Sequence, residues 1–197
     1  MKNLFAVVLL WLCGASSSFS EEKMIEEEVV VEGAPTFVVV LPEKIEEETY
    51  LPVGGNENMQ HIVQSEIEKS LIRKDITVIE IAGLDPQIEG GLSWQTLTVK
   101  KGALVIARAV NADYLVYGQA TVVRAGTREA YGVTATRAQA NITARLVRVS
   151  DGKILQVMDA EALEGNAAFG IAANDALKAA GKSIAKKVAT ACEAVVE

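Results

Sequence analysis

The clearest hydrophobic pattern in this chain of 197 residues is a strict alternation between Arg137 and Leu146. Every second residue is alanine, isoleucine or leucine, and the residues between them are arginine, glutamine, asparagine or threonine. Successive side chains of a β-strand point to opposite faces of a sheet. The alternation therefore predicts a strand with one face in the core and the other in water.

A turn at Ser150–Lys153 follows this strand and leads into a second predicted strand at residues 154–163. A two-residue Asp-Gly turn would pair Ala144 with Asp159 and bury a carboxylate on the apolar face. One more loop residue brings apolar residues together instead: Leu146 with Met158, Ala144 with Ala160 and Ile142 with Ala162. Because burying an unpaired charge costs more free energy than a β-bulge, we predict the longer, bulged turn.

Three more segments have the composition of strands. Residues 37–41 form a continuous apolar run that ends at Pro42, which is typical of a strand covered on both faces. Residues 76–81 and 114–124 form two further runs rich in β-branched residues. Gly118, in the middle of the last run, predicts either a bulge or a close approach of another backbone.

Two segments repeat apolar residues every three or four positions and predict amphipathic helices. The first covers residues 59–73, and Asn56 or Asn58 could cap it. The second covers about residues 97–110 and ends at Asn111, because asparagine tolerates the left-handed conformation that stops a helix.

A long helix is predicted over residues 174–195. Its inner stripe consists of small and apolar residues: Ala172, Ala176, Ala179, Ala180, Ile184, Val188, Ala191, Cys192 and Val195. Lys178, Lys182 and Lys186 recur on the outer side. Gly181 costs about 1 kcal/mol relative to alanine inside a helix, which indicates either tight packing at this position or a slight kink.

The elements follow the order β-α-β-α-β-β-β-α. This order predicts an α/β (α+β) fold, with a mixed sheet of about five strands and a long alanine-rich C-terminal helix. We assign this single domain to residues 36–197. The stretch Pro42–Asn58 carries five acids and Gly54-Gly55, so we predict a mobile loop there, and residues 83–95 form a second loop.

Residues 1–20 have the features of a secretory signal peptide. Lys2 supplies the positive start, residues 4–13 supply the short apolar run, and Ser20 is the small residue before the cut. An apolar run of this length does not span a bilayer. We therefore predict export to the periplasm, with residues 21–35 as an acidic, disordered lead-in.

Cys13 offers an alternative, since acylation of a cysteine after the apolar run would anchor the chain in the outer membrane. Leu10 and Gly14 fit a lipobox, but the bulky Leu12 stands where a small residue is usual. We therefore expect Cys13 to belong to the signal peptide, with lipidation at Cys13 and association with the outer membrane as the alternative.

The net charge of the chain limits the kinds of molecule that it is expected to bind. The formal net charge is −7 at pH 7, and loss of Lys2 with the signal peptide makes it more negative. Nucleic acids and anionic membranes attract clustered lysine and arginine, so neither is an expected partner. Cys192 is the cysteine that remains after cleavage, which excludes an intramolecular disulfide and favours a buried, inert thiol.

No motif in the chain predicts a catalytic, cofactor-binding or metal-binding residue. His61 is the sole histidine, and we expect it on the surface of the first helix. Gly54-Gly55 and Gly90-Gly91 lack the residues that complete a phosphate-binding loop. The alternative of another class is a periplasmic hydrolase that uses Asp85, in a loop, and Asp113, at a helix-to-strand junction.

Two local motifs carry a family resemblance. Residues 107–118 place Asn-Ala-Asp-Tyr between a helix and an apolar run that ends in glycine, and residues 144–154 place Ser-Asp-Gly-Lys between two strands. With the alanine-rich helix at residues 172–195, they resemble the superfamily of curli-secretion proteins, penicillin-binding-protein activators and flagellar-assembly-T proteins. The resemblance implies a domain like the N-terminal domain of TolB and a role in envelope assembly through protein partners, without catalysis or a cofactor.

The departures from that family narrow the expected role. A curli-type pore inserts long alternating hairpins into the membrane, and residues 125–132 are too short and too polar for this. The synthase activators are normally lipoproteins, which the residues before Cys13 do not favour. We expect a non-enzymatic periplasmic accessory protein of a flagellar or secretion apparatus; the alternative is an outer-membrane lipoprotein that activates a peptidoglycan synthase.

Three residues are candidates for contact with a protein partner. Trp94 lies in a glycine-rich loop, and tryptophan is a frequent anchor at interfaces. Arg137 and Arg145 lie on the polar face of the alternating strand. The expected partners are envelope proteins or further copies of the chain itself.

Overall fold

The computed structural model describes residues 33–53, 61–82, 84, 91–130 and 132–196. The predicted signal peptide, Cys13, nearly all of the acidic lead-in, Asn56, Asn58 and Asp85 lie outside these residues.

Seven strands and four helices form within the described part of the chain. The strands are β1 (Thr36–Val40), β2 (Glu43–Ile45), β3 (Glu48–Tyr50), β4 (Thr77–Ile79), β5 (Tyr114–Ala130), β6 (Val133–Arg148) and β7 (Ile154–Asn166). The helices are α1 (Ile62–Ile72), α2 (Trp94–Leu97), α3 (Lys100–Ala109) and α4 (Phe169–Val196).

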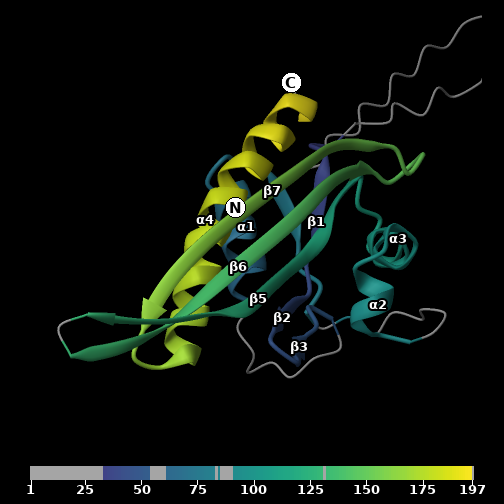
Figure 1. Cartoon of the computed structure of the whole chain (residues 1–197). Helices are drawn as coiled ribbons and strands as arrows, with labels where there is room; N and C mark the ends of the chain where they lie inside the picture. The colour runs from purple at the N-terminus through teal and green to yellow at the C-terminus, as the bar shows by residue number, and fades with distance from the viewer. Residues whose placement is uncertain (1–32, 54–60, 83, 85–90, 131, 197) are drawn as a thin grey trace, which may run out of the picture. The chain divides into compact units, whose positions relative to one another are not determined.

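One mixed sheet joins the strands, which confirms the predicted fold class (Figure 1). β1 lies between β4 and β5 and is parallel to both. β6 is antiparallel to β5 on one side and to β7 on the other. The predicted element order is present, and the structure adds the short hairpin β2–β3 and the short helix α2.

The helices divide between the two faces of the sheet (Figure 1). α1 and α4 share one core with one face of β1, β5, β6 and β7. α2 and α3 share a second core with the other face of β1 and the start of β5. The run Phe37–Leu41 is therefore buried on both faces, as its continuous apolar sequence predicts.

The prediction of a loop throughout Pro42–Asn58 was wrong for β2 and β3. β1 and β2 follow β5 in one register, since Val40 pairs with Tyr117 and Glu43 with Ala120. Pro42 separates β1 from β2 because it has no N–H to donate to β5. Its carbonyl oxygen still accepts a hydrogen bond from the N–H of Ala120 at 3.1 Å. β2 therefore forms because β5 is long enough to pair with it, although the polar composition of residues 43–45 does not suggest a strand.

The third and fourth predicted strands, which we ended at Arg124 and began at Arg137, are longer than predicted. β5 and β6 continue side by side as far as the pair Ala130–Val133, with a register shift between Arg124 and Thr127. The bulge lies there and not at Gly118. Gly118 marks a close approach instead, because an ideal Cβ at this position would lie 1.9 Å from the carbonyl oxygen of Thr143.

The pairing of β6 with β7 differs from the predicted register by two residues. Ala144 pairs with Met158, Ile142 with Ala160 and Leu146 with Gln156. The apolar residues do share a face, and Asp159 lies opposite Thr143 on the other face. The bulge lies inside β7, where Leu146 and Val147 pair with residues that are two apart. The turn is closed at Arg148, whose N–H donates to the Lys153 carbonyl at 3.0 Å, so it is one residue longer than we predicted.

The helices also differ from their predicted ends. α1 begins at Ile62 with His61 at its N-cap position, and the predicted caps Asn56 and Asn58 lie outside the described residues. α3 stops before Asn111, whose φ of 53° confirms the left-handed stop. α4 starts five residues before the predicted Asn174 and runs unbroken through Gly181. A Cβ added at Gly181 would lie 3.5 Å from the Cα of Val63, an ordinary contact distance, so the packing that we predicted there does not require glycine.

Candidate protein-binding surface

The three long strands β5, β6 and β7 share one face that points away from α1 and α4. On this face, no helix of the described residues covers the part of β5 that follows Tyr117. Figure 1 shows β5, β6 and β7 crossing in front of α4 and α1. We call this surface the open face. It consists of Gln119, Thr121, Val123, Gln139, Asn141, Thr143, Arg145, Val157, Asp159, Glu161 and Leu163. Their alternation with buried residues, such as Ala140 and Ala144, follows from the period of a strand.

Large apolar side chains are exposed on the open face. Val123 is 49% exposed, Val157 is 51% exposed and Leu163 is 45% exposed. Exposed apolar residues among polar ones are typical of surfaces that bind other proteins. We did not single out these three residues from the sequence, because the pattern of residues 154–163 was used only to place the inward face.

The two predicted arginines lie on β6 on the side of the open face. The guanidinium carbon of Arg145 lies 5.8 Å from the centre of the Tyr117 ring, and both Arg145 and Arg137 are half-buried. Eight strand residues separate them, a distance of roughly 27 Å. Trp94 belongs to another element, since it is the first residue of α2, which packs against α3. The three candidates therefore do not form one cluster.

Trp94 is held by a well-formed helix start. The Ser93 hydroxyl accepts a hydrogen bond from the N–H of Thr96 at 3.2 Å, and the Thr96 hydroxyl accepts one from the N–H of Ser93 at 3.0 Å. This capping box replaces the predicted loop around Trp94. The tryptophan is half-buried, so it covers the core at least in part.

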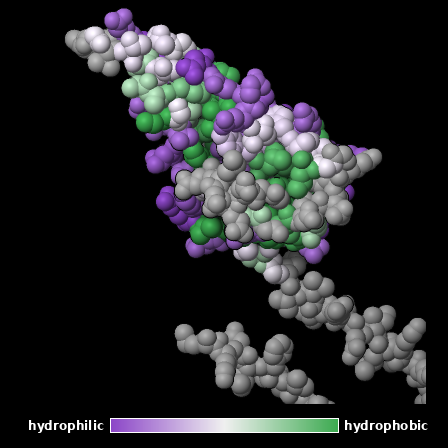
Figure 2. Space-filling model, turned by 90° about the horizontal axis from the view of Figure 1, so that it is seen from below, coloured by the Kyte–Doolittle hydropathy of each residue, from purple (hydrophilic) through white to green (hydrophobic). Residues whose placement is uncertain are grey.

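The far end of the β5–β6 hairpin is the most exposed part of the sheet. Gly126, Thr127, Arg128 and Glu129 are all exposed. Figure 2 shows hydrophobic and strongly hydrophilic residues intermixed on this end of the molecule. Arg124 anchors the base of the hairpin, since its guanidinium lies 4.3 Å from the centre of the Phe169 ring at the start of α4.

A buried polar cluster lies behind the break between β1 and β2. The Glu43 carboxylate, 2% exposed, accepts a hydrogen bond from the N–H of Val63 at 2.7 Å. Glu43 thereby caps the start of α1 from another element, since the N-cap residue of α1 makes no side-chain hydrogen bond to the helix. Burial outweighs these hydrogen bonds and raises the pKa of Glu43 from 4.5 to about 7.

His61, the N-cap residue of α1, is not the surface histidine that we predicted. It is half-buried, and burial lowers the pKa of its imidazole. Its Nδ1 atom is buried and has no hydrogen-bond partner among the described residues. Nearby, the Gln64 amide donates a hydrogen bond to Glu68 at 2.8 Å, and its oxygen accepts one from Leu41 at 3.4 Å.

Asp113, one of the two hydrolase candidates, is tied to the backbone. Its carboxylate accepts hydrogen bonds from the N–H of Thr36 at 2.8 Å and from the Thr36 hydroxyl at 2.9 Å. These bonds join the amino ends of β1 and β5, whereas ligands of parallel sheets bind at the carboxyl ends. These bonds disfavour Asp113 as a residue of a ligand site, and the alternative of a hydrolase stays a prediction.

The remaining chemistry of the described residues is sparse. They contain no group of three or more His, Cys, Asp or Glu side chains that could hold a metal ion. They also contain no helix with the length and apolar character needed to cross a membrane. Cys192 is buried, as we predicted. Burial raises the pKa of its thiol to about 12, which disfavours the reactive thiolate.

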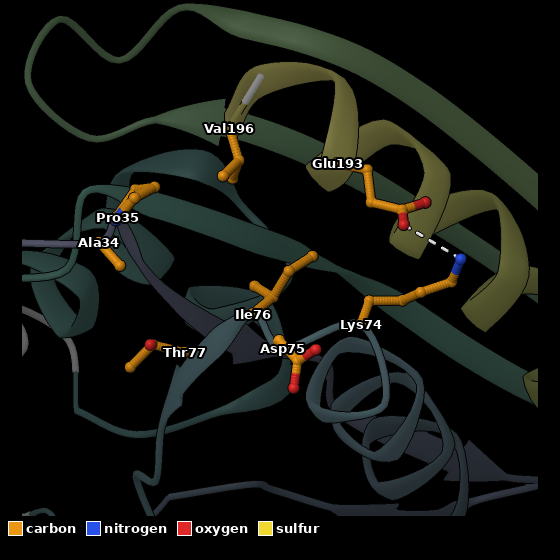
Figure 3. A pocket seen from close by; sticks show the side chains of 8 residues that line it. All are labelled: Ala34, Pro35, Lys74, Asp75, Ile76, Thr77, Glu193 and Val196. Atoms are coloured by element: carbon orange, nitrogen blue, oxygen red, sulfur yellow. Dashed lines mark ion pairs between the residues drawn. The ribbon is translucent and has the colours of Figure 1, made fainter.

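A small hollow of about 230 Å³ lies where the start of β1, the α1–β4 junction and the end of α4 meet (Figure 3). Figure 3 shows Lys74 and Glu193 pointing toward each other, and their ion pair measures 3.0 Å. Since these two charges satisfy each other, the hollow offers little to a charged ligand.

Comparisons with known proteins gave structural likenesses at low sequence identity. No family model matches the chain, and no curated protein matches it. The PelC dodecamer from Paraburkholderia phytofirmans is 16% identical, with a TM-score of 0.40, over 76% of this chain and 86% of PelC. A minor lipoprotein from Acinetobacter baumannii is 8% identical, with a TM-score of 0.42, over 82% of this chain and 94% of that protein. The LpoB C-terminal domain from Salmonella enterica is 17% identical, with a TM-score of 0.30, over 68% of this chain and 86% of that domain.

Proposed function

We propose that this protein is a non-enzymatic accessory protein of a bacterial cell-envelope machine, flagellar or secretory, and that it binds a protein partner through the open face. The exposed apolar side chains of Val123, Val157 and Leu163 between polar neighbours are the observation that carries the proposal. The resemblance of the sequence to envelope assembly proteins and the predicted signal peptide at residues 1–20 support the location in the cell envelope.

Site-specific photocrosslinking in the native periplasm tests the partner. With a photoreactive residue at Val123, we expect a crosslink to an envelope protein that mass spectrometry identifies. Reversal of two charges on β6, Arg137→Glu with Arg145→Glu, is expected to lower its yield about ten-fold. Lys178→Glu, on the exposed side of α4, is the matched control and should leave the yield unchanged. Equal yields from all these proteins would contradict the proposed surface.

The mass of the mature chain tests how the protein is attached. Cleavage after Ser20 gives a soluble chain that begins at Glu21, and this is the expected result. A chain that begins at an acylated Cys13 would instead make the protein an outer-membrane lipoprotein, the alternative in which it activates a peptidoglycan synthase.

A further inference from the structure

Strand β7 has an unpaired edge beside the open face. Among the described residues, β7 pairs only with β6, and this pairing runs from Val147–Ile154 to Thr136–Asn166. In an antiparallel sheet, the N–H and C=O groups of alternate residues point to opposite edges of a strand. Half of the backbone groups of β7 therefore point away from β6.

One hydrogen bond identifies the residues whose backbone groups point to the free edge. The Lys187 ammonium, which reaches across from α4, donates a hydrogen bond to the carbonyl oxygen of Asp159. The carbonyl of Asp159 thus lies on the free edge, and by alternation so do those of Val157, Glu161 and Leu163. A lysine side chain occupies the place that the N–H of another strand would take.

The side chains of the same four residues lie on the open face, where they form a symmetrical pattern. Val157 and Leu163 are apolar and exposed at the two ends, and Asp159 and Glu161 are acidic and exposed between them. The Thr143 hydroxyl holds one oxygen of Asp159 at 2.7 Å. Within the described part of the chain, neither acid forms an ion pair.

The two acids determine which kind of strand can pair with the free edge of β7. A second copy of β7 in antiparallel alignment would bring Asp159 of one chain next to Glu161 of the other, and like charges directly opposite destabilise a sheet. A strand with lysine or arginine opposite the two acids and apolar residues at its ends would pair with all four side chains.

We propose that the free edge of β7 binds an extended segment of a partner protein by strand addition, with basic residues opposite Asp159 and Glu161. The inference rests on the proposed binding function and names the class of partner segment. Lys187 then acts as a competitor, because its ammonium must leave the Asp159 carbonyl before a partner N–H can bind there.

Synthetic peptides test the pairing on the full mature chain. We expect Val-Thr-Lys-Thr-Lys-Thr-Val to bind about ten-fold more tightly than the same peptide with glutamate in place of lysine. N-methylation of the peptide residues whose N–H groups face β7 should abolish binding, whereas N-methylation of the alternate residues should not. Equal binding of both N-methylated peptides would overturn the proposal, because charge attraction alone would then explain the result.

Variants of the protein sharpen the test. Lys187→Met should strengthen binding of the lysine peptide several-fold, and Lys182→Met, on the exposed side of the same helix, should leave it unchanged. Glu161→Pro removes an N–H that points off the sheet, so it should abolish binding while the ladder with β6 stays intact. Asp159→Lys with Glu161→Lys should reverse the preference toward the glutamate peptide, and the same preference in this variant would overturn the proposal.

The outcomes also separate this inference from the proposed function. If the β6 charge reversals abolish the periplasmic crosslink but Glu161→Pro does not, the open face binds the partner and strand addition is wrong. If the protein dimerises in sedimentation and Glu161→Pro makes it monomeric, the occupant is a second copy and the basic partner is wrong. If neither set of variants changes the crosslink, both proposals fail.

Discussion

Gly118 is the residue at which β5 approaches β6 too closely for a side chain. An added Cβ would lie 1.9 Å from the Thr143 carbonyl oxygen and 2.9 Å from the Cα of Ala144. Both contacts are with backbone, which cannot move aside without breaking the ladder. Gly118→Ala is therefore expected to lower the free energy of unfolding by about 3 kcal/mol or more, measured by urea denaturation.

Gly181→Ala is the matched control for this prediction. The nearest neighbour of an added Cβ in α4 is the Cα of Val63 at 3.5 Å, an ordinary contact distance. Alanine has the higher helix propensity, so the variant should be as stable as the original chain or up to about 1 kcal/mol more stable. A loss of stability in Gly181→Ala equal to that in Gly118→Ala would contradict this account of the two glycines.

At the scale of elements, Glu43 links β2 to the start of α1 through a buried carboxylate. Its pKa rises from 4.5 to about 7 in the folded protein, so the folded state holds this proton more tightly than the unfolded chain does. The stabilisation from Glu43 is complete below pH 4.5 and is lost as the pH rises through about 7. We expect the free energy of unfolding to fall by roughly 3 kcal/mol over that range from this group alone.

Urea denaturation at several pH values checks this prediction with one variant. Glu43→Gln keeps an acceptor for the Val63 N–H but does not ionise, so the difference between its stability and that of the original chain should grow with pH. His61 titrates in both proteins and cancels in that difference. Parallel curves for the original chain and Glu43→Gln would contradict the buried-carboxylate account.

Pairing between strands shows what a local pattern specifies about an element. The alternation in β6 correctly predicted which residues point inward, because a shift of one residue would move every apolar side chain to water. It did not predict which residue lies opposite which, since a shift of two preserves both faces. The position of the bulge inside β7 decides the register, and no local pattern in residues 154–163 marks it.

At the scale of the whole molecule, the outer half of the β5–β6 hairpin extends beyond both cores. Its residues 126–129 are exposed, and the buried residues of the sheet begin at Ala138. Replacing residues 126–135 with an Asn-Gly turn should therefore change the free energy of unfolding by less than about 1 kcal/mol. A cooperative thermal transition within a few degrees of the original one is the expected measurement. A collapse of the transition would show that the hairpin end stabilises the fold.

The sequence by itself determined the fold class, most strands, the inward stripe of α4 and the buried Cys192, because each depends on a periodicity or composition within one segment. Only the tertiary structure decided the β2–β3 hairpin, the buried environment of Glu43 and His61, the hydrogen bonds of Asp113 and the uncovered face of β5–β7. Each of these depends on which element lies against which. The pKa of Glu43 rises because α1 and β5 exclude water from it, and Val157 is exposed because the helices cover the opposite side of the sheet.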